Sequence, residues 1–292
     1  MNRRHLVFIV NPRSGVKRQK AVEQAVDAFL DKTQYSYEIQ HTRFARHGTE
    51  LAREAAAAGA FAVVAVGGDG SVNDVASGLC GTDTALAIIP KGSGNGMART
   101  LGLPRQTAAA IRVINGGRIA QMDIGFADER LFVSNAGVGF EALISEKFAP
   151  SKRRGFFTYG MLVTKHLWRY HSREWRISID GKELQTRAFM VSVANGQHFG
   201  YNFRIAPQAD WKDGLLDLVI VRDFPKLLGL PLLFRLMNGS LLKSRYVAHY
   251  RGREVTVTHP GLSLLQTDGE AHPCGSAVRF RIEPSALRVI IP

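Results

Sequence analysis

The sequence predicts two domains: an N-terminal α/β domain with a parallel sheet over residues 1–120, and a C-terminal antiparallel β-sandwich over residues 121–292. A length of 292 residues suits two domains, since a domain averages roughly 150 residues. Apolar strands alternate with helices in the first part, whereas short strands with period-two alternation dominate the second. Whether the last strand returns to the first domain stays open.

Four apolar segments predict the strands of the first domain. These segments are His5–Val10, Tyr35–His41, Phe61–Val66 and Ala85–Ile89. The residues between them have helical patterns at 17–32, at 49–58 and from about Val72, and Gly59 is expected to end the second helix. An uninterrupted Val- and Ala-rich run such as Phe61–Val66 is typical of a parallel strand that is buried on both faces.

Alternating residues predict the strands of the second domain. Three such segments are Glu174–Asp180, Glu254–Thr258 and Val278–Ile282. Apolar residues alternate with polar ones in each, as in an antiparallel sheet with one face on a core. Helical patterns interrupt these strands at 155–170 and at 225–243.

The composition favours an ordered globular protein with an anionic partner. Hydrophobic residues make up 45% of the chain and charged residues 22%, which is close to globular averages and argues against global disorder. Lys and Arg number 38 against 25 Asp and Glu, a net charge of +13. Such a charge favours nucleic acid, an anionic membrane surface or phosphorylated substrates as partners.

Cysteine content and apolar runs bear on the compartment. Cys80 and Cys274 are too few for a disulfide framework or a cysteine metal site, which favours a reducing compartment. The first apolar run ends at Asn11-Pro12 and is too short for a signal peptide. No run approaches the roughly 20 residues of a transmembrane helix. We therefore expect a cytoplasmic protein.

Three loops of small residues follow strands of the first domain. They are Asn11-Pro12-Arg13-Ser14-Gly15, Gly67-Gly68-Asp69-Gly70-Ser71 and Pro90-Lys91-Gly92-Ser93-Gly94-Asn95. In a Rossmann-like domain the carboxyl ends of parallel strands meet at one edge, where ligands bind. Glycine lets the backbone approach a phosphate, and the helix that follows offers free N–H donors. The alternative is a set of tight turns in which Asp69 caps a helix.

These loops, with Asn73, Asp74 and the turn Thr267-Asp268-Gly269-Glu270, resemble in order and spacing the motifs of the diacylglycerol kinase catalytic family. That family includes bacterial lipid kinases, sphingosine kinases and ceramide kinases, and the resemblance covers nearly the whole chain. It implies transfer of the γ-phosphate of ATP to a lipid hydroxyl, with ATP and Mg²⁺ as cofactors. The lipid, diacylglycerol or a sphingoid base, stays open.

The resemblance implies a nucleotide site at the same strand ends. The residues implied in ATP binding are Asn11, Ser14, Gly15, Thr42, Gly67, Gly68, Asp69, Gly70, Ser71, Asn73, Gly92, Ser93 and Asn95. Thr42 follows the strand Tyr35–His41 and so belongs to this edge. Gly96 departs from the bacterial members, which usually carry Asp there, so that one carboxylate near the metal is missing.

Three carboxylates are implied in catalysis. Glu270 matches the proposed proton acceptor, Asp69 is expected to act on the metal and the phosphates, and Asp123 on the metal or the lipid head group. A base is useful because a hydroxyl nucleophile is barely ionised at neutral pH. The alternatives are a hairpin turn with an exposed acid for Glu270 and an ordinary strand-end residue for Asp123.

The resemblance also implies a second, structural Mg²⁺. Its ligands would be the side chain of Asp213 and the backbone carbonyl oxygens of Leu216 and Leu218. Hard cations accept carbonyl oxygens, so apolar residues can serve as ligands. The alternative is a turn that enters a strand.

Cations and aromatic residues gather in the segment 151–170. The residues are Ser151-Lys152-Arg153-Arg154-Gly155-Phe156-Phe157, followed by Lys165, Trp168, Arg169 and Tyr170. They favour peripheral contact with an anionic membrane surface, where each cation contributes roughly 1 kcal/mol. The alternative is a helix with its charges in solvent. Lys226, Arg235, Lys243 and Arg245 allow the same argument more weakly.

Two other functions remain open. The Gly67–Gly70 loop is shared with NAD kinases, so an NAD kinase-like phosphotransferase is one alternative. A non-enzymatic basic binding module is the other. No nucleic-acid-binding motif is present and the basic residues are spread along the chain, so we expect no nucleic-acid partner. The oligomeric state, monomer or homodimer, stays open.

Overall fold

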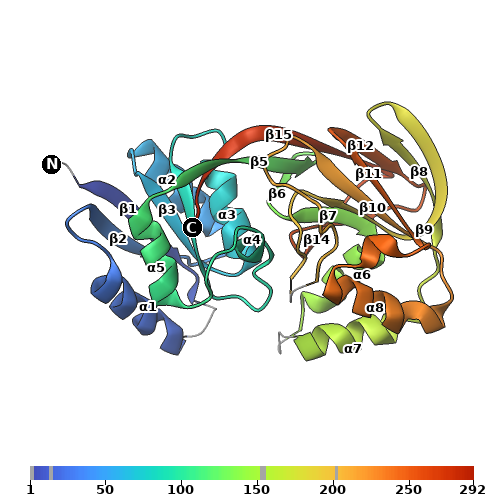
Figure 1. Cartoon of the computed structure of the whole chain (residues 1–292), viewed down its shortest axis with the longest axis horizontal. Helices are drawn as coiled ribbons and strands as arrows, with labels where there is room; N and C mark the ends of the chain where they lie inside the picture. Colours follow the sequence, from blue (N-terminus) through green and yellow to red (C-terminus); the bar gives the residue numbers. More distant parts are fainter. Residues whose placement is uncertain (1–2, 13–15, 152–155, 201–202) are drawn as a thin grey trace. The chain divides into compact units, whose positions relative to one another are not determined.

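The computed structural model describes residues 3–12, 16–151, 156–200 and 203–292 (Figure 1). The chain folds as two compact units. The N-terminal unit is Met1–Asp123 together with Ser285–Pro292, and the C-terminal unit is Ile124–Pro284. The chain passes between the units in β5 (Ile119–Ala127) and again in β15 (Ala277–Ile290). The C-terminal unit is therefore inserted into the N-terminal unit.

The N-terminal unit is a parallel sheet with helices on both faces, as expected. Its strands lie in the order β2 (Tyr35–His41), β1 (Arg4–Val10), β3 (Ala62–Gly67) and β4 (Ala85–Pro90). One face carries α1 (Val16–Phe29) and α5 (Thr107–Gly116), and the other carries α2 (His47–Ala57) and α3 (Asp69–Leu79) (Figure 1). The short helix α4 (Gly96–Thr100) follows β4. The end of β15 pairs with β4 in parallel, with Val289 opposite Leu86.

Local sequence explains where these elements begin and end. Every residue of β3 and of β4 is buried, as expected for strands covered on both faces. Gly59 follows α2 with a positive φ of 78°, which residues other than glycine rarely adopt. Helix α3 begins at Asp69, before the expected start near Val72, because Gly68 is extended and caps the helix.

The C-terminal unit is an antiparallel sandwich, which confirms the predicted fold class. Its strands are β6 (Arg130–Phe132), β7 (Asn135–Gly139), β8 (Arg173–Ile179), β9 (Lys182–Ala194), β10 (Leu216–Arg222), β11 (Val247–Gly252), β12 (Glu254–Thr258), β13 (Leu264–Thr267) and β14 (Glu270–Pro273). The first half of β9 pairs with β8, and its second half lies between β7 and β10. Trp175, Phe132 and Phe280 are fully buried in its core.

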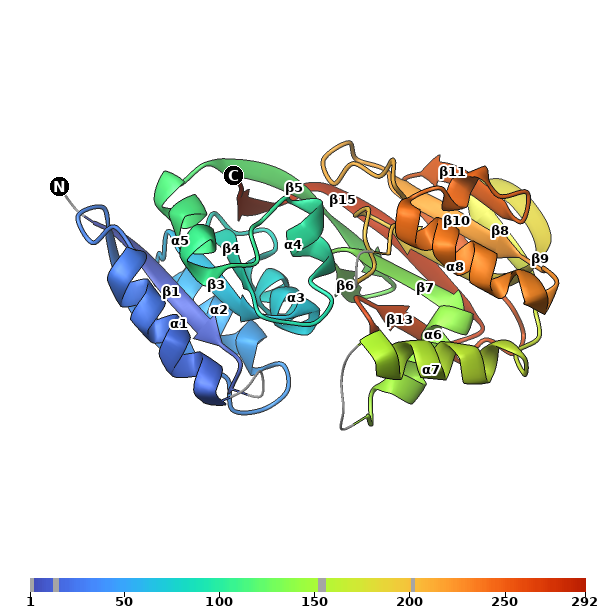
Figure 2. The ribbon, with the colours of Figure 1, turned by 60° about the horizontal axis from the view of Figure 1, so that its bottom comes forward.

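Three helices lie together on one side of this unit (Figure 2). They are α6 (Phe140–Phe148), α7 (Phe156–Leu167) and α8 (Gly229–Asn238). The expected insertion at 225–243 is divided into η2 (Lys226–Leu228), α8 and η3 (Leu241–Lys243). Gly239, with a φ of 75°, ends α8. No helix in the described part of the chain is long and apolar enough to cross a bilayer.

Candidate functional site

The carboxyl ends of β3 and β4 meet at two glycines. A Cβ atom on Gly92 would lie 2.4 Å from the Cα of Gly68, closer than real side chains come. The backbone N–H groups of Lys91 and Gly92 donate to the carbonyl oxygen of Gly67 at 2.7 and 3.2 Å. Glycine is required at both loops because the two backbones touch.

Asp69 joins the two loops. Its Oδ2 accepts the N–H of Asn95 at 2.9 Å and its Oδ1 accepts the N–H of Gly96 at 2.6 Å. Asn95 closes its own loop through two side-chain contacts with Gly92, at 3.0 and 2.8 Å. Asp69 therefore fixes the second loop to the first turn of α3. Sequence reasoning expected Asp69 to act on the metal and the phosphates and did not predict these contacts, and the catalytic role stays a prediction.

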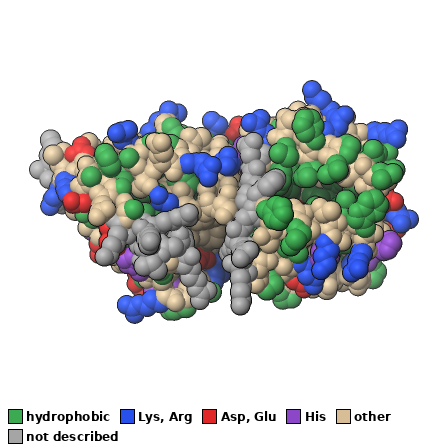
Figure 3. Space-filling model, turned by 90° about the horizontal axis from the view of Figure 1, so that it is seen from below, with side chains coloured by type: hydrophobic (Ala, Val, Ile, Leu, Met, Phe, Trp, Pro, Cys, Tyr) green, Lys and Arg blue, Asp and Glu red, His purple; other side chains and the backbone are tan. Residues whose placement is uncertain are grey.

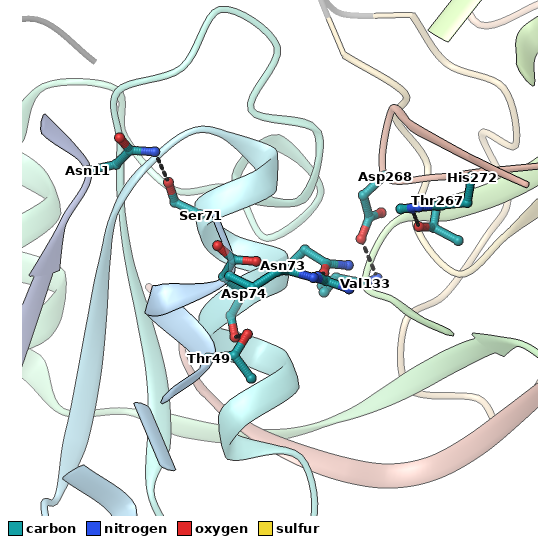
Figure 4. Close-up of polar contacts among 10 residues, drawn as sticks. Asn11, Thr49, Ser71, Asn73, Asp74, Val133, Thr267, Asp268 and His272 are labelled. Carbon is teal, nitrogen blue, oxygen red and sulfur yellow. Dashed lines mark hydrogen bonds and ion pairs between the residues drawn. The ribbon is translucent and has the colours of Figure 1, made fainter. Parts of the chain in front are cut away.

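Three of the expected nucleotide residues lie around one small pocket. The pocket is lined by Ile9, Asn11, Thr42, Gly48, Ser71 and Asp74. The amide nitrogen of Asn11 donates to the hydroxyl of Ser71 at 3.5 Å (Figure 4). The N–H of Thr42 donates to the carbonyl of Val10 at 3.0 Å, which holds the end of β2 beside β1. The ends of β1 and β2 and the start of α3 thus come together.

Sequence reasoning missed an arginine at this edge. The guanidinium of Arg46 donates to Oδ1 of Asn73 at 3.0 Å and lies 3.4 Å from Oδ1 of Asp74. The hydroxyl of Thr49 donates to the backbone carbonyl of Asp74 at 2.9 Å. Arg46 stands in the left-handed region, with a φ of 66°. No motif marked it, because its partners Asn73 and Asp74 lie 27 and 28 positions away in the sequence.

The remaining expected nucleotide residues divide into two groups. Gly67 ends β3, Gly68 and Gly70 lie at the start of α3, and Gly92 and Ser93 lie in the loop after β4. Ser14 and Gly15 lie outside the described residues.

Asp123 lies where the chain leaves the N-terminal unit. Its side chain is buried, and Oδ1 accepts the N–H of Ser285 at 2.7 Å. Ser285 is the residue at which the chain re-enters this unit, and its φ is 55°. The described contact of Asp123 therefore holds the two chain crossings together.

A tight hairpin in the C-terminal unit carries the expected Asp-Gly turn. Asp268 and Gly269 have φ values of 47° and 88° between β13 and β14. The carboxylate of Asp268 accepts the N–H groups of Val133, Ser134 and Asn135 at 2.7, 2.8 and 3.1 Å. Figure 4 shows the bond to Val133. Three N–H donors on one carboxylate fix the turn to the start of β7. Sequence reasoning missed this role, since the partners lie more than 130 positions away.

Glu270 is the first residue of β14, opposite Thr267, and its side chain is exposed. The residues around it are held in place. The N–H of Gly269 donates to Oε1 of Gln266 at 2.8 Å, and the hydroxyl of Thr267 lies 3.0 Å from Nε2 of His272. The turn thus presents an accessible carboxylate on an anchored backbone, which suits a residue that exchanges a proton with a substrate.

The comparisons with known proteins match both units. Residues 5–127 match the diacylglycerol kinase catalytic domain, and residues 134–291 match the YegS C-terminal NAD kinase β-sandwich-like domain. The chain belongs to the diacylglycerol kinase catalytic family. This confirms the resemblance and places the chain among the lipid kinases.

Curated relatives agree with this family, and a solved structure shares the fold. The chain is 33% identical over 252 residues to a probable YegS-like lipid kinase of Chromohalobacter salexigens, with 84% of this chain and 80% of the relative covered. It is 32% identical over 259 residues to a diacylglycerol kinase of Mycobacterium tuberculosis, covering 85% and 81%. A putative diacylglycerol kinase structure from Bacillus anthracis shares the fold, with a TM-score of 0.82 at 21% identity over 100% of this chain and 98% of that one.

The structural Mg²⁺ implied by the diacylglycerol kinase family does not fit the residues at Asp213. Its Oδ1 accepts the N–H of Leu215 at 3.0 Å, and its Oδ2 is bonded to the guanidinium of Arg251. Arg251 also lies 3.7 Å from Asp217. A cation on Asp213 would meet a guanidinium that already neutralises the carboxylate. Among the described residues, no group of three or more His, Cys, Asp and Glu side chains could hold a metal ion.

Proposed function

We propose that this protein transfers the γ-phosphate of ATP to the hydroxyl group of a lipid, either diacylglycerol or a sphingoid base. The observation that carries the proposal is the pair of glycine loops at the ends of β3 and β4, joined by Asp69. Bare backbone and the N–H groups at the start of α3 suit phosphate oxygens. Mg²⁺ bound together with ATP would neutralise negative charge on the phosphates beside these loops.

Each described part of the site contributes to this reaction. Asn11, Thr42 and Ser71 offer amide and hydroxyl groups to the nucleotide beside the phosphate loops. Asp69 holds the two loops in one geometry, which matters because phosphoryl transfer depends mainly on positioning and on charge stabilisation. Arg46 adds a positive charge at the same edge.

Glu270 acts as the base that accepts the proton of the lipid hydroxyl. Support for this role comes from its exposure and from the anchored turn that carries it. The role requires the carboxylate to reach the lipid hydroxyl during the reaction, with the oxygen of that hydroxyl directed at the γ-phosphate.

The direct test supplies radiolabelled ATP and Mg²⁺ with diacylglycerol, a sphingoid base and a monoacylglycerol, each in vesicles, and with NAD in a parallel reaction. We expect label in one lipid product and none in NADP. Label in NADP alone would support an NAD kinase-like enzyme. Absence of transfer to every acceptor, together with absence of ATP binding, would contradict the proposal and support a binding module.

A further inference from the structure

Two helices of the C-terminal unit expose large apolar side chains. The exposed residues are Phe157 (85%), Met161 (57%) and Trp168 (57%) on or just after α7, and Leu227 (80%), Leu230 (76%), Phe234 (66%) and Met237 (44%) on η2 and α8. In the described part of the chain only Phe29 and Phe44 are further exposed large hydrophobic residues. Figure 3 shows hydrophobic side chains gathered on the underside of this unit, with lysines and arginines beside them. We name these seven residues the α7–α8 face.

Both helices are apolar on their inner sides as well. Leu162 and Leu167 of α7, and Leu232 and Leu236 of α8, pack against the core beneath them. The helices lie side by side (Figure 2), and a Cβ on Gly229 would lie only 2.6 Å from Leu167. A helix that is hydrophobic all round is usually buried. Large exposed apolar patches usually mark interaction sites. We therefore expect the outward side of this helix pair to contact a partner rather than water.

The two segments that carry the α7–α8 face are rich in cations. Residues 148–172 and 224–253 contain five and six Lys and Arg residues and no Asp or Glu, and Lys152, Arg153 and Arg154 among them lie outside the described residues. Lys165, Arg169, Lys243 and Arg245 are exposed, and none of them joins an ion pair between described residues. A second copy of this chain would bring like charges together on the same face, whereas an anionic surface would neutralise them.

Lys226 differs from these cations. Its ammonium lies 4.5 Å from the ring centre of Phe189 and 5.4 Å from that of Phe224. It is directed into the apolar layer under α8 and is no part of the charged rim.

We propose that the α7–α8 face docks on an anionic bilayer, with its apolar side chains in the interfacial layer and Lys165, Arg169, Lys243 and Arg245 at the level of the lipid phosphates. The proposal deepens the lipid kinase function, on which it rests for the biological reason to dock. Docking itself needs neither ATP nor a phosphate acceptor. The sequence pointed to the cations of 151–170, while the apolar side of α8 came from the structure.

The test is sedimentation of the full chain with vesicles of phosphatidylcholine and phosphatidylglycerol that contain no diacylglycerol, sphingoid base or ATP. Leu230→Ser with Phe234→Ser should lower the partition coefficient at least tenfold. Lys165→Glu with Arg169→Glu should lower it by more than roughly fivefold for each residue changed, because each change removes a cation and adds an anion, and this difference should shrink at high salt. Phe29→Ser and Lys182→Glu are matched controls on the N-terminal unit and on the β8–β9 turn, and they should sediment like the wild type.

The outcomes separate docking from catalysis. Transfer to short-chain diacylglycerol in detergent micelles should stay within about twofold of the wild type in the Leu230→Ser/Phe234→Ser protein. Leu227→Ser is a third variant, since a side chain that is 80% exposed contributes little to folding. Unchanged sedimentation of folded variants, checked by circular dichroism, would overturn the proposal. Loss of a dimer in sedimentation velocity would overturn it too, and would assign the face to a second copy of this chain.

Discussion

The carboxyl group of Glu141 fills the space that a side chain on Gly137 would need: a Cβ on Gly137 would lie 1.6 Å from Oε1 of Glu141. Gly137 is in β7, and Glu141 is in the first turn of α6. Burial raises the pKa of Glu141 well above its usual value, and contacts with Ser192 and Gln266 offset this only in part. The folded chain therefore keeps this carboxyl protonated at pH values where an ordinary glutamate is ionised.

Replacing Glu141 by Gln should remove a pH dependence of stability. The pKa of Glu141 is higher in the folded chain than in the unfolded chain. The neutral carboxyl therefore stabilises the fold fully at pH values below the pKa of Glu141 in the unfolded chain. This stabilisation is lost as pH rises toward the pKa of Glu141 in the folded chain. Between these two values the wild type should lose about 1.4 kcal/mol per pH unit relative to Glu141→Gln. Urea unfolding of both proteins from pH 5 to pH 8 measures this. A difference that does not change with pH would contradict the raised pKa.

Gly137→Ala should destabilise the C-terminal unit severely. The added methyl would meet Glu141 and also the backbone carbonyl of Val191, 2.5 Å away, which cannot rotate aside. We expect a loss of about 3 kcal/mol. Gly116→Ala, in α5 of the N-terminal unit, is the control, since the added group meets no atom within 4 Å beyond its chain neighbours and its own helix backbone and alanine favours helix. Thermal unfolding of the two variants compares them, and equal melting temperatures would contradict the close contact.

Asp69→Ala should lower turnover by roughly 100-fold or more, because a shift of about 1 Å in a reacting group has that effect. The variant frees the N–H groups of Asn95 and Gly96 and releases the second glycine loop. Steady-state kinetics with ATP and the lipid acceptor measure the effect. Asp83→Ala, at an exposed carboxylate of the same unit, is the control. Near-normal turnover of a folded Asp69→Ala protein would contradict the proposed role of Asp69 in the reaction.

Glu270→Gln should reduce turnover by roughly 10²–10⁴-fold, the range for loss of a general base. The substitution keeps the size of the side chain and removes its basicity, and the anchored turn is untouched. ATP affinity, measured by calorimetry, should stay the same. Loss of ATP binding would make Glu270 a ligand of the nucleotide or its metal. Glu129→Gln, at another exposed glutamate of the same unit, should leave turnover unchanged.

We expect the stability of the protein to be independent of divalent cations, because Arg251 forms an ion pair with Asp213. Addition of EDTA should leave the melting temperature of the wild type unchanged. Arg251→Ala should cost about 1 kcal/mol and should make the melting temperature rise with millimolar Mg²⁺, since Asp213 then lacks a cation. Arg279→Ala breaks the ion pair with Glu254 and should show no response to Mg²⁺. A fall in the wild-type melting temperature with EDTA would place a metal at Asp213.

The sequence predicted the parts of the fold that depend on local pattern. Buried runs such as Phe61–Val66 identify parallel strands, and the loops that follow them identify one edge of the sheet, because parallel strands have a common direction. The division of residues 225–243 into three short helices was not predicted. Gly229 and Gly239 interrupt the pattern there: α8 begins at Gly229, which lies against Leu167, and ends before Gly239.

The parts of the site that the sequence did not predict depend on contacts across long stretches of chain. The bonds from Asp69 to the second loop, and from Asp268 to Val133, join residues whose spacing has no periodicity. Asp268 was expected only as part of a turn. The burial of Glu141 could not be inferred from its place in an amphipathic helix, because the space for its side chain is provided by Gly137 on β7.

The insertion of one unit within the other constrains the order of folding during synthesis. The N-terminal unit needs Ser285–Pro292 for the bond to Asp123 and for the pairing of Val289 with Leu86. A ribosome makes these residues only after all of the C-terminal unit. Domains usually fold in the order of their synthesis. Here the N-terminal unit is synthesised first in part, but its last residues are synthesised after the whole C-terminal unit. The sheet that carries the glycine loops is therefore completed only after the C-terminal unit has been synthesised.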